Sequence, residues 1–80
     1  MHELKLVRAL FKDLINLAQQ KHAKKIKSVT IRMGDFSEIT PEVVSFYFKD
    51  NSKNTIAEAA EIIFEHSPNR ELRLLSFDYD

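Results

Sequence analysis

Eighty residues with 44% hydrophobic side chains are enough for one compact core and too few for two. Twelve basic and twelve acidic residues cancel, so the net charge gives no electrostatic case for a nucleic-acid-binding protein. The chain has no cysteine, which excludes disulfides and is in keeping with a cytoplasmic protein. No apolar run approaches the ~18 residues that span a membrane, so we expect neither a membrane span nor a signal peptide.

Apolar residues near the start of the chain recur at spacings of three and four. This spacing predicts an amphipathic helix over residues 3–22. Its apolar stripe consists of Leu4, Val7, Leu10, Phe11, Leu14, Leu17 and Ala18, widened by Leu6 and Ile15. His22 stands at the predicted end, where its side chain can cap carbonyls. The lysines that follow suit a helix C-terminus, because cations interact favourably with the negative end of the helix dipole.

Residues 25–33 alternate between apolar and polar side chains. Val29, Ile31 and Met33 fall on one face, which predicts a half-buried strand. Gly34, the only glycine, ends it, and a glycine there indicates either a positive φ or a close backbone approach.

A second helix is predicted to start at Thr40-Pro41, with Thr40 as the N-cap and Pro41 in the first helical position. We expect its apolar side chains to enter the core. They are Val43, Val44, Phe46, Tyr47 and Phe48.

Two strands, over residues 60–65 and 71–79, complete the chain. Pro68 and Asn69 are favoured turn residues, so the segment Ser67-Pro68-Asn69-Arg70 predicts an antiparallel hairpin between these strands. The first two strands flank a helix and should be parallel. The expected fold is a single α/β (α+β) domain over residues 1–80, with element order α-β-α-β-β and two helices on one face of a three-stranded mixed sheet.

The first residues form a compact group of nitrogen ligands. If Met1 carries a free amine, that amine, the His2 backbone nitrogen and the His2 imidazole can chelate one metal ion. Planar nitrogen ligands suit Ni(II) or Cu(II), and the chemistry alone does not choose between them. The competing interpretation is a histidine that stands by chance at a frayed terminus.

Several blocks of sequence together resemble one protein family. They are MHEL at 1–4, IRMGDFSEITPE at 31–42, FYF at 46–48, AAEIIFE at 59–65 and ELRLLSFD at 71–78. In this order, with the first block at residue 1, they resemble the HypA/HybF nickel metallochaperones of [NiFe] hydrogenase and urease maturation.

The chain departs from the family in one respect. The family normally inserts a zinc lobe with two Cys-x-x-Cys pairs between the last two strands, whereas only the short turn at 67–70 stands here. Without cysteine a thiolate zinc site is impossible, so no zinc is expected. The sequence does not tell a natural zinc-free form from a zinc-lobe-deleted variant.

The resemblance implies Ni(II) as the cargo and Met1, His2 and Glu3 as the metal site. Glu3 comes from the family motif Met-His-Glu, and its backbone nitrogen would complete the ligand plane. Its carboxylate would act as an outer group, or would simply stabilise the helix dipole. Thr40 stands where some family members carry an acidic residue, and a hydroxyl there favours a cap.

The resemblance also implies partners: a HypB-type nickel GTPase, the hydrogenase large subunit precursor and urease maturation proteins. His22 and His66 are weaker ligand candidates. No catalytic constellation or phosphate loop is recognisable, so we expect a protein that is not an enzyme. Two alternatives stay open, a metal-free α/β protein-interaction module and a domain-swapped dimer.

Overall fold

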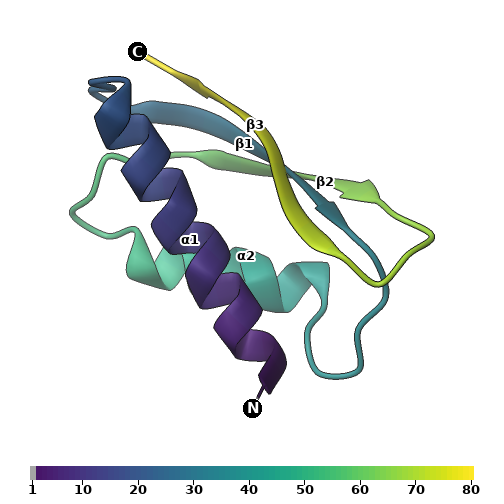
Figure 1. Cartoon of the computed structure of the whole chain (residues 1–80). Coiled ribbons are helices and arrows are strands. Elements are labelled where there is room, and N and C mark those ends of the chain that lie inside the picture. Colours follow the sequence, from purple (N-terminus) through teal and green to yellow (C-terminus); the bar gives the residue numbers. More distant parts are fainter. Residues whose placement is uncertain (1) are drawn as a thin grey trace.

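A computed structural model describes residues 2–80. The elements are α1 (His2–Gln20), β1 (Ile26–Met33), α2 (Pro41–Asn51), β2 (Glu61–His66) and β3 (Leu72–Tyr79), as Figure 1 shows. The predicted element order and α+β class are therefore confirmed. Within the described residues, no helix combines the length and apolarity that a membrane span needs.

The three strands form one mixed sheet with the order β2-β1-β3. β1 and β2 are parallel, as predicted, and β1 and β3 are antiparallel. The predicted hairpin is wrong, because β2 and β3 lie on opposite sides of β1 and do not pair. Strands two positions apart are separated by about 10 Å, a distance that the short connection between His66 and Leu72 can span.

This connection passes directly over the end of β1. A Cβ atom at Gly34 would lie 1.6 Å from the carbonyl oxygen of Asn69, so only glycine fits beneath the crossing backbone. The Ser67 N–H donates to the Met33 carbonyl at 3.0 Å, and the Gly34 N–H donates to the Glu71 carbonyl at 2.9 Å. Gly34 therefore serves a close backbone approach, the second of its two predicted roles, and its φ is not positive.

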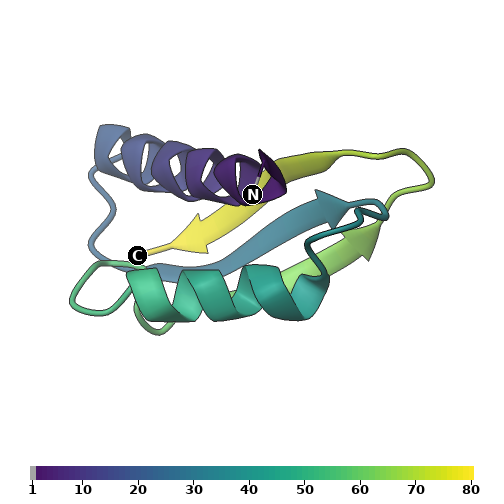
Figure 2. The ribbon, with the colours of Figure 1, turned by 90° about the horizontal axis from the view of Figure 1, so that it is seen from below.

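Both helices cover the same face of the sheet. The buried side chains of β1 join those of both helices in a single core, which consists of Val7, Leu10, Leu14, Ala18, Ile26, Val29, Ile31, Met33, Ile39, Val44, Phe48 and Ala57. Figure 2 shows α1 along the β3 side and α2 along the β2 side of the sheet. Register shifts between Ile26 and Ser28 and between Thr30 and Ile31 interrupt the β1–β3 pairing, whereas the β1–β2 pairing has no shift.

The apolar stripe of α1 is only partly buried. Val7, Leu14 and Ala18 are fully buried, but Leu6 and Leu17 are exposed. At 100° per residue, these two leucines point away from the flank of α1 that carries Phe11, which packs edge-on against Phe48.

The C-terminal end of α1 is closed by its own backbone. His22 adopts a positive φ of 55°, its N–H donates to the Gln19 carbonyl, and the Ala23 N–H donates to the Ala18 carbonyl. These two bonds form a Schellman motif, so the helix ends before the predicted boundary at residue 22.

The start of α2 agrees with the prediction. The Thr40 hydroxyl accepts the Val43 N–H at 3.2 Å, and Pro41 occupies the first turn. The expected burial is confirmed for Val44 and Phe48 but is wrong for Val43 and Phe46, which are exposed; Phe46 retains 73% of its accessible surface.

Candidate functional site at the N-terminal end of α1

The carboxylate of Glu3 lies at the meeting point of three segments. It accepts hydrogen bonds from the Ser37 N–H at 3.3 Å, the Ser37 hydroxyl at 2.9 Å and the Glu38 N–H. Arg70 of the β2–β3 connection completes the group through an ion pair at 2.7 Å. Glu3 keeps only 4% of its accessible surface. Its carboxylate is therefore a buried charge, and the hydrogen bonds and the ion pair offset the cost of removing it from water.

These contacts stabilise the ionised form of Glu3. Burial by itself raises the pKa of this carboxyl, but the bonds from Glu38, Arg70 and Ser37 outweigh burial and lower the pKa to about 2. Glu3 is therefore an anion at neutral pH, with its oxygens already engaged by donors.

The carboxylate of Glu38 also lies close to the first turn of α1. The Glu3 N–H points toward Oε1 of Glu38 at 3.5 Å, while the Glu38 N–H donates to Glu3. The first backbone N–H groups of a helix have no intrahelical acceptor and carry the positive end of its dipole. Glu38 thus supplies an acceptor and a negative charge where both are favourable.

Arg70 links this helix end to the β2–β3 connection. Its guanidinium lies 5.3 Å from the ring centroid of Phe36 and forms the ion pair with Glu3. The connection is fixed in turn by the Ser67 hydroxyl, which donates to Glu71 at 2.6 Å. That bond is the main cause that lowers the pKa of Glu71, with burial opposing it and Arg73 and Arg32 assisting.

The other candidate residues have different positions. Met1 and the side chain of His2 lie outside the part of the chain that the structure describes, although the His2 backbone begins α1. His22 is exposed at the far end of α1, and His66 lies 3.6 Å from Asp35 on the surface. Among the described residues, no three His, Asp or Glu side chains are grouped as a metal site.

The sequence does not predict any of the partners of Glu3. Ser37 and Glu38 belong to a block that resembles the family, but nothing in that block indicates a contact with Glu3, and the sequence around Arg70 predicts only a turn. Arg70 lies 67 positions away from Glu3 in the chain, so no local spacing indicates their contact.

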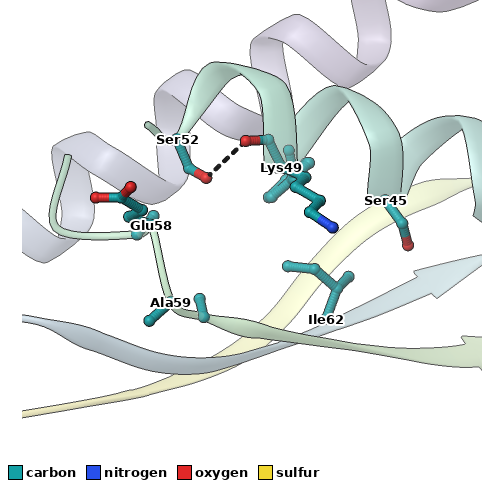
Figure 3. Close-up of a pocket in the computed structure, with 9 residues that line it drawn as sticks. Ser45, Lys49, Ser52, Glu58, Ala59 and Ile62 are labelled. Atoms are coloured by element: carbon teal, nitrogen blue, oxygen red, sulfur yellow. Dashed lines mark hydrogen bonds between the residues drawn. The ribbon is translucent and has the colours of Figure 1, made fainter. Parts of the chain in front are cut away.

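A separate hollow lies near the C-terminal end of α2, beside β2. Figure 3 shows the Lys49 side chain extending from α2 toward Ile62 on β2, with Glu58 and Ala59 at one side. The hollow encloses about 360 Å³ and its walls include Ser45, Ser52, one amine and one carboxylate. Its lining does not include any residue of the Glu3 cluster.

Known proteins share extended sequence similarity with this chain. Residues 1–71 match the model of the family described as "Hydrogenase/urease nickel incorporation, metallochaperone, hypA". The hydrogenase maturation factor HypA of Caldanaerobacter subterraneus subsp. tengcongensis is 38% identical over 65 residues, which cover 81% of this chain and 57% of that protein. HypA of Archaeoglobus fulgidus is 39% identical over 62 residues, which cover 78% of this chain and 56% of that protein. The chain belongs to the HypA family.

Solved structures support the same fold. The solution structure of the Ni metallochaperone HypA from Helicobacter pylori has a TM-score of 0.73 at 17% identity and covers 94% of each chain. A second HypA solution structure has a TM-score of 0.75 at 18% identity and covers 99% of this chain and 96% of the other. The chain spans about half the length of the curated HypA relatives that it matches.

Proposed function

We propose that this HypA-family chain binds Ni(II) at Met1, His2 and Glu3 and delivers it for hydrogenase or urease maturation. The ligands would be the Met1 amine, the backbone nitrogens of His2 and Glu3, and the His2 imidazole. The observation that carries the proposal is the buried carboxylate of Glu3, the last residue of the Met-His-Glu motif, whose contacts with Ser37, Glu38 and Arg70 hold the first turn of α1 in place.

The helix geometry is compatible with backbone ligands. The first N–H groups of an α-helix have no partner in the helix ladder, so a metal can take their nitrogens, once each amide has lost its proton to solvent, without breaking intrahelical bonds. The Glu3 nitrogen would exchange its 3.5 Å contact with Glu38 for the metal. The Glu3 carboxylate already accepts bonds from Ser37, Glu38 and Arg70. Glu3 would therefore contribute its backbone nitrogen to the metal and use its carboxylate to hold the helix end in place.

We assign the protein a carrier role and not an enzymatic one, in the cytoplasm. A carrier must hold its metal and also release it, and ligands that take up protons again on release allow both. Delivery requires the donor and acceptor sites to approach, so we place the docking site of a HypB-type GTPase at the first turns of α1. The hydrogenase large subunit precursor would be the final recipient, or a urease maturation protein in its place.

A Ni(II) titration of the tag-free protein, followed by absorption spectroscopy and calorimetry, tests the proposal. We expect a one-to-one complex with the spectrum of diamagnetic square-planar nickel. His2→Ala, and a form with one residue added before Met1, should both lose it. Cu(II) should displace nickel, because copper binds such sites more tightly.

Two histidine variants serve as matched controls. His22→Ala and His66→Ala should bind nickel like the parent chain, since both residues lie elsewhere on the surface. Binding that survives the His2 change and the added residue would contradict the proposed site. An absence of binding in the parent protein would favour the metal-free interaction module instead.

A further inference from the structure

The sheet has two free edges within the described residues, and they differ in regularity. β3 pairs with β1 through two register shifts, one of which leaves Leu75 of β3 without a partner on β1, and a bulge in an edge strand discourages the addition of another strand. β2 pairs with β1 without any shift, so its outer edge presents a regular row of backbone donors and acceptors. β2 is therefore the edge that suits strand addition.

A groove runs beside this edge, between β2 and α2. One hollow of about 450 Å³ is lined by Pro41, Glu42, Ser45, Phe46, Lys49, Ile62 and Phe64. It shares Ser45, Lys49 and Ile62 with the hollow of Figure 3, so the two form one groove along α2. Phe46, with 73% of its surface exposed, stands on its wall.

The two faces of β2 specify what could add to it. Ile62 and Phe64 are half-buried toward the groove, whereas Glu61, Ile63 and Glu65 face the opposite side and are exposed. An added strand would place alternate side chains on the same two faces. Apolar side chains would fit the groove beside Ile62 and Phe64, and basic side chains would complement the two glutamates.

A second copy of the chain meets two obstacles at this edge. Antiparallel self-pairing of β2 centred on Ile63 places Glu61 opposite Glu65 of the other copy, and like charges in directly opposite positions are destabilising. α2 also lies along the β2 side of the sheet (Figure 2), so two copies would bring their helices together over the shared edge. An extended segment without a covering helix avoids both problems.

We propose that the edge of β2 and the α2 groove bind an extended segment of a partner protein, with apolar side chains on one face and basic side chains on the other. Backbone hydrogen bonds to β2 would supply affinity, and the groove and the glutamates would supply specificity. This surface is separate from the Glu3 cluster and does not depend on metal binding.

The test uses a labelled, amidated eight-residue peptide that alternates lysine with leucine or valine, measured by fluorescence anisotropy. We expect saturable binding of the peptide, and Phe46→Ser should weaken it roughly tenfold. Phe46 is exposed, so this substitution does not disturb the core. The matched control is Leu17→Ser, which alters an exposed leucine on α1 and should leave binding unchanged. Glu61→Lys combined with Glu65→Lys should weaken binding, as should exchange of the peptide lysines for glutamate.

Peptides that are N-methylated at alternate positions test strand addition itself. Methylation of the set of amides that faces β2 should abolish binding, whereas methylation of the other set should leave it intact. The proposal is overturned by an absence of saturable binding, by equal loss with both methylated peptides, or by a loss with Leu17→Ser that equals the loss with Phe46→Ser. Dimerisation of the chain through β2 in place of peptide binding would also overturn it.

Discussion

The two ends of α1 are stabilised in opposite ways. The N-terminal end depends on side chains from distant parts of the sequence, because Glu3 is bound by Ser37, Glu38 and Arg70. The C-terminal end depends on the helix's own backbone, closed by bonds from His22 and Ala23. The end that carries the proposed metal site should thus be sensitive to charge, pH and distant mutations, and the other end mainly to local backbone conformation.

The largest effect on stability is expected at Gly34. Its missing side chain leaves room for the β2–β3 connection, which carries Arg70. Gly34→Ala places a Cβ 1.6 Å from the Asn69 carbonyl oxygen, so the crossing backbone must move. We expect the free energy of unfolding to fall by about 3 kcal/mol, measured by urea denaturation. Asp35→Ala is the matched control, since its side chain is 98% exposed, and should change stability by less than about 0.5 kcal/mol. Equal effects of the two changes would contradict the close crossing.

A smaller but more specific effect is expected from the buried carboxylate. Glu3→Ala removes the acceptor of Ser37, Glu38 and Arg70, so the thermal midpoint should fall by several degrees. Amide hydrogen exchange should accelerate in the first turns of α1 and stay unchanged at residues 19–23. Glu61→Ala, on the exposed face of β2, is the control and should leave both measurements unaltered. Faster exchange at both ends of α1 would show that the ends are not independent.

The same contrast explains what the sequence could and could not predict. Helices, strands and the Thr40 cap follow local rules of periodicity and capping, and these predictions are confirmed. The pairing of β3 is not local, because turn residues at 67–70 suit a short crossover as well as a hairpin. Gly34 was the useful signal, since a close backbone approach at the end of β1 fits a crossing segment and not a hairpin.

The exposure of individual side chains and the partners of Glu3 cannot be predicted from the sequence for a related reason. Periodicity shows which residues share a helix face, but the width of the covered surface depends on what packs there. Leu6 and Leu17 therefore belong to the apolar stripe and are still exposed, and the expectation that Val43 and Phe46 enter the core is wrong. Glu3 was predicted from the family motif, whereas its contact with Arg70 depends on the crossing of the β2–β3 connection.

The pH dependence of stability should follow the Glu3 cluster. Its folded-state pKa of about 2 lies below the ordinary glutamate pKa of 4.5, so the unfolded chain binds more protons in this range. The contribution is fully present above pH 4.5 and is lost as the pH falls toward 2. Glu71, whose pKa is also lowered, adds to the loss in acid. Urea denaturation across this window should show a smaller loss for Glu3→Gln than for the parent chain, and parallel curves would contradict the assignment.

The smallest expected effect lies at the C-terminal end of α1 and has the opposite sign. His22 holds a φ of 55°, which costs a residue with a Cβ about 1–2 kcal/mol and costs glycine little. Part of this gain is offset because glycine loses more backbone freedom on folding, so His22→Gly should stabilise the protein by about 0.5–1 kcal/mol. Gln19→Gly, three residues earlier inside the helix, should instead destabilise it by about 1 kcal/mol. Denaturant midpoints of the two variants should therefore move in opposite directions, because position 22 requires a left-handed backbone conformation, which glycine adopts more readily than histidine.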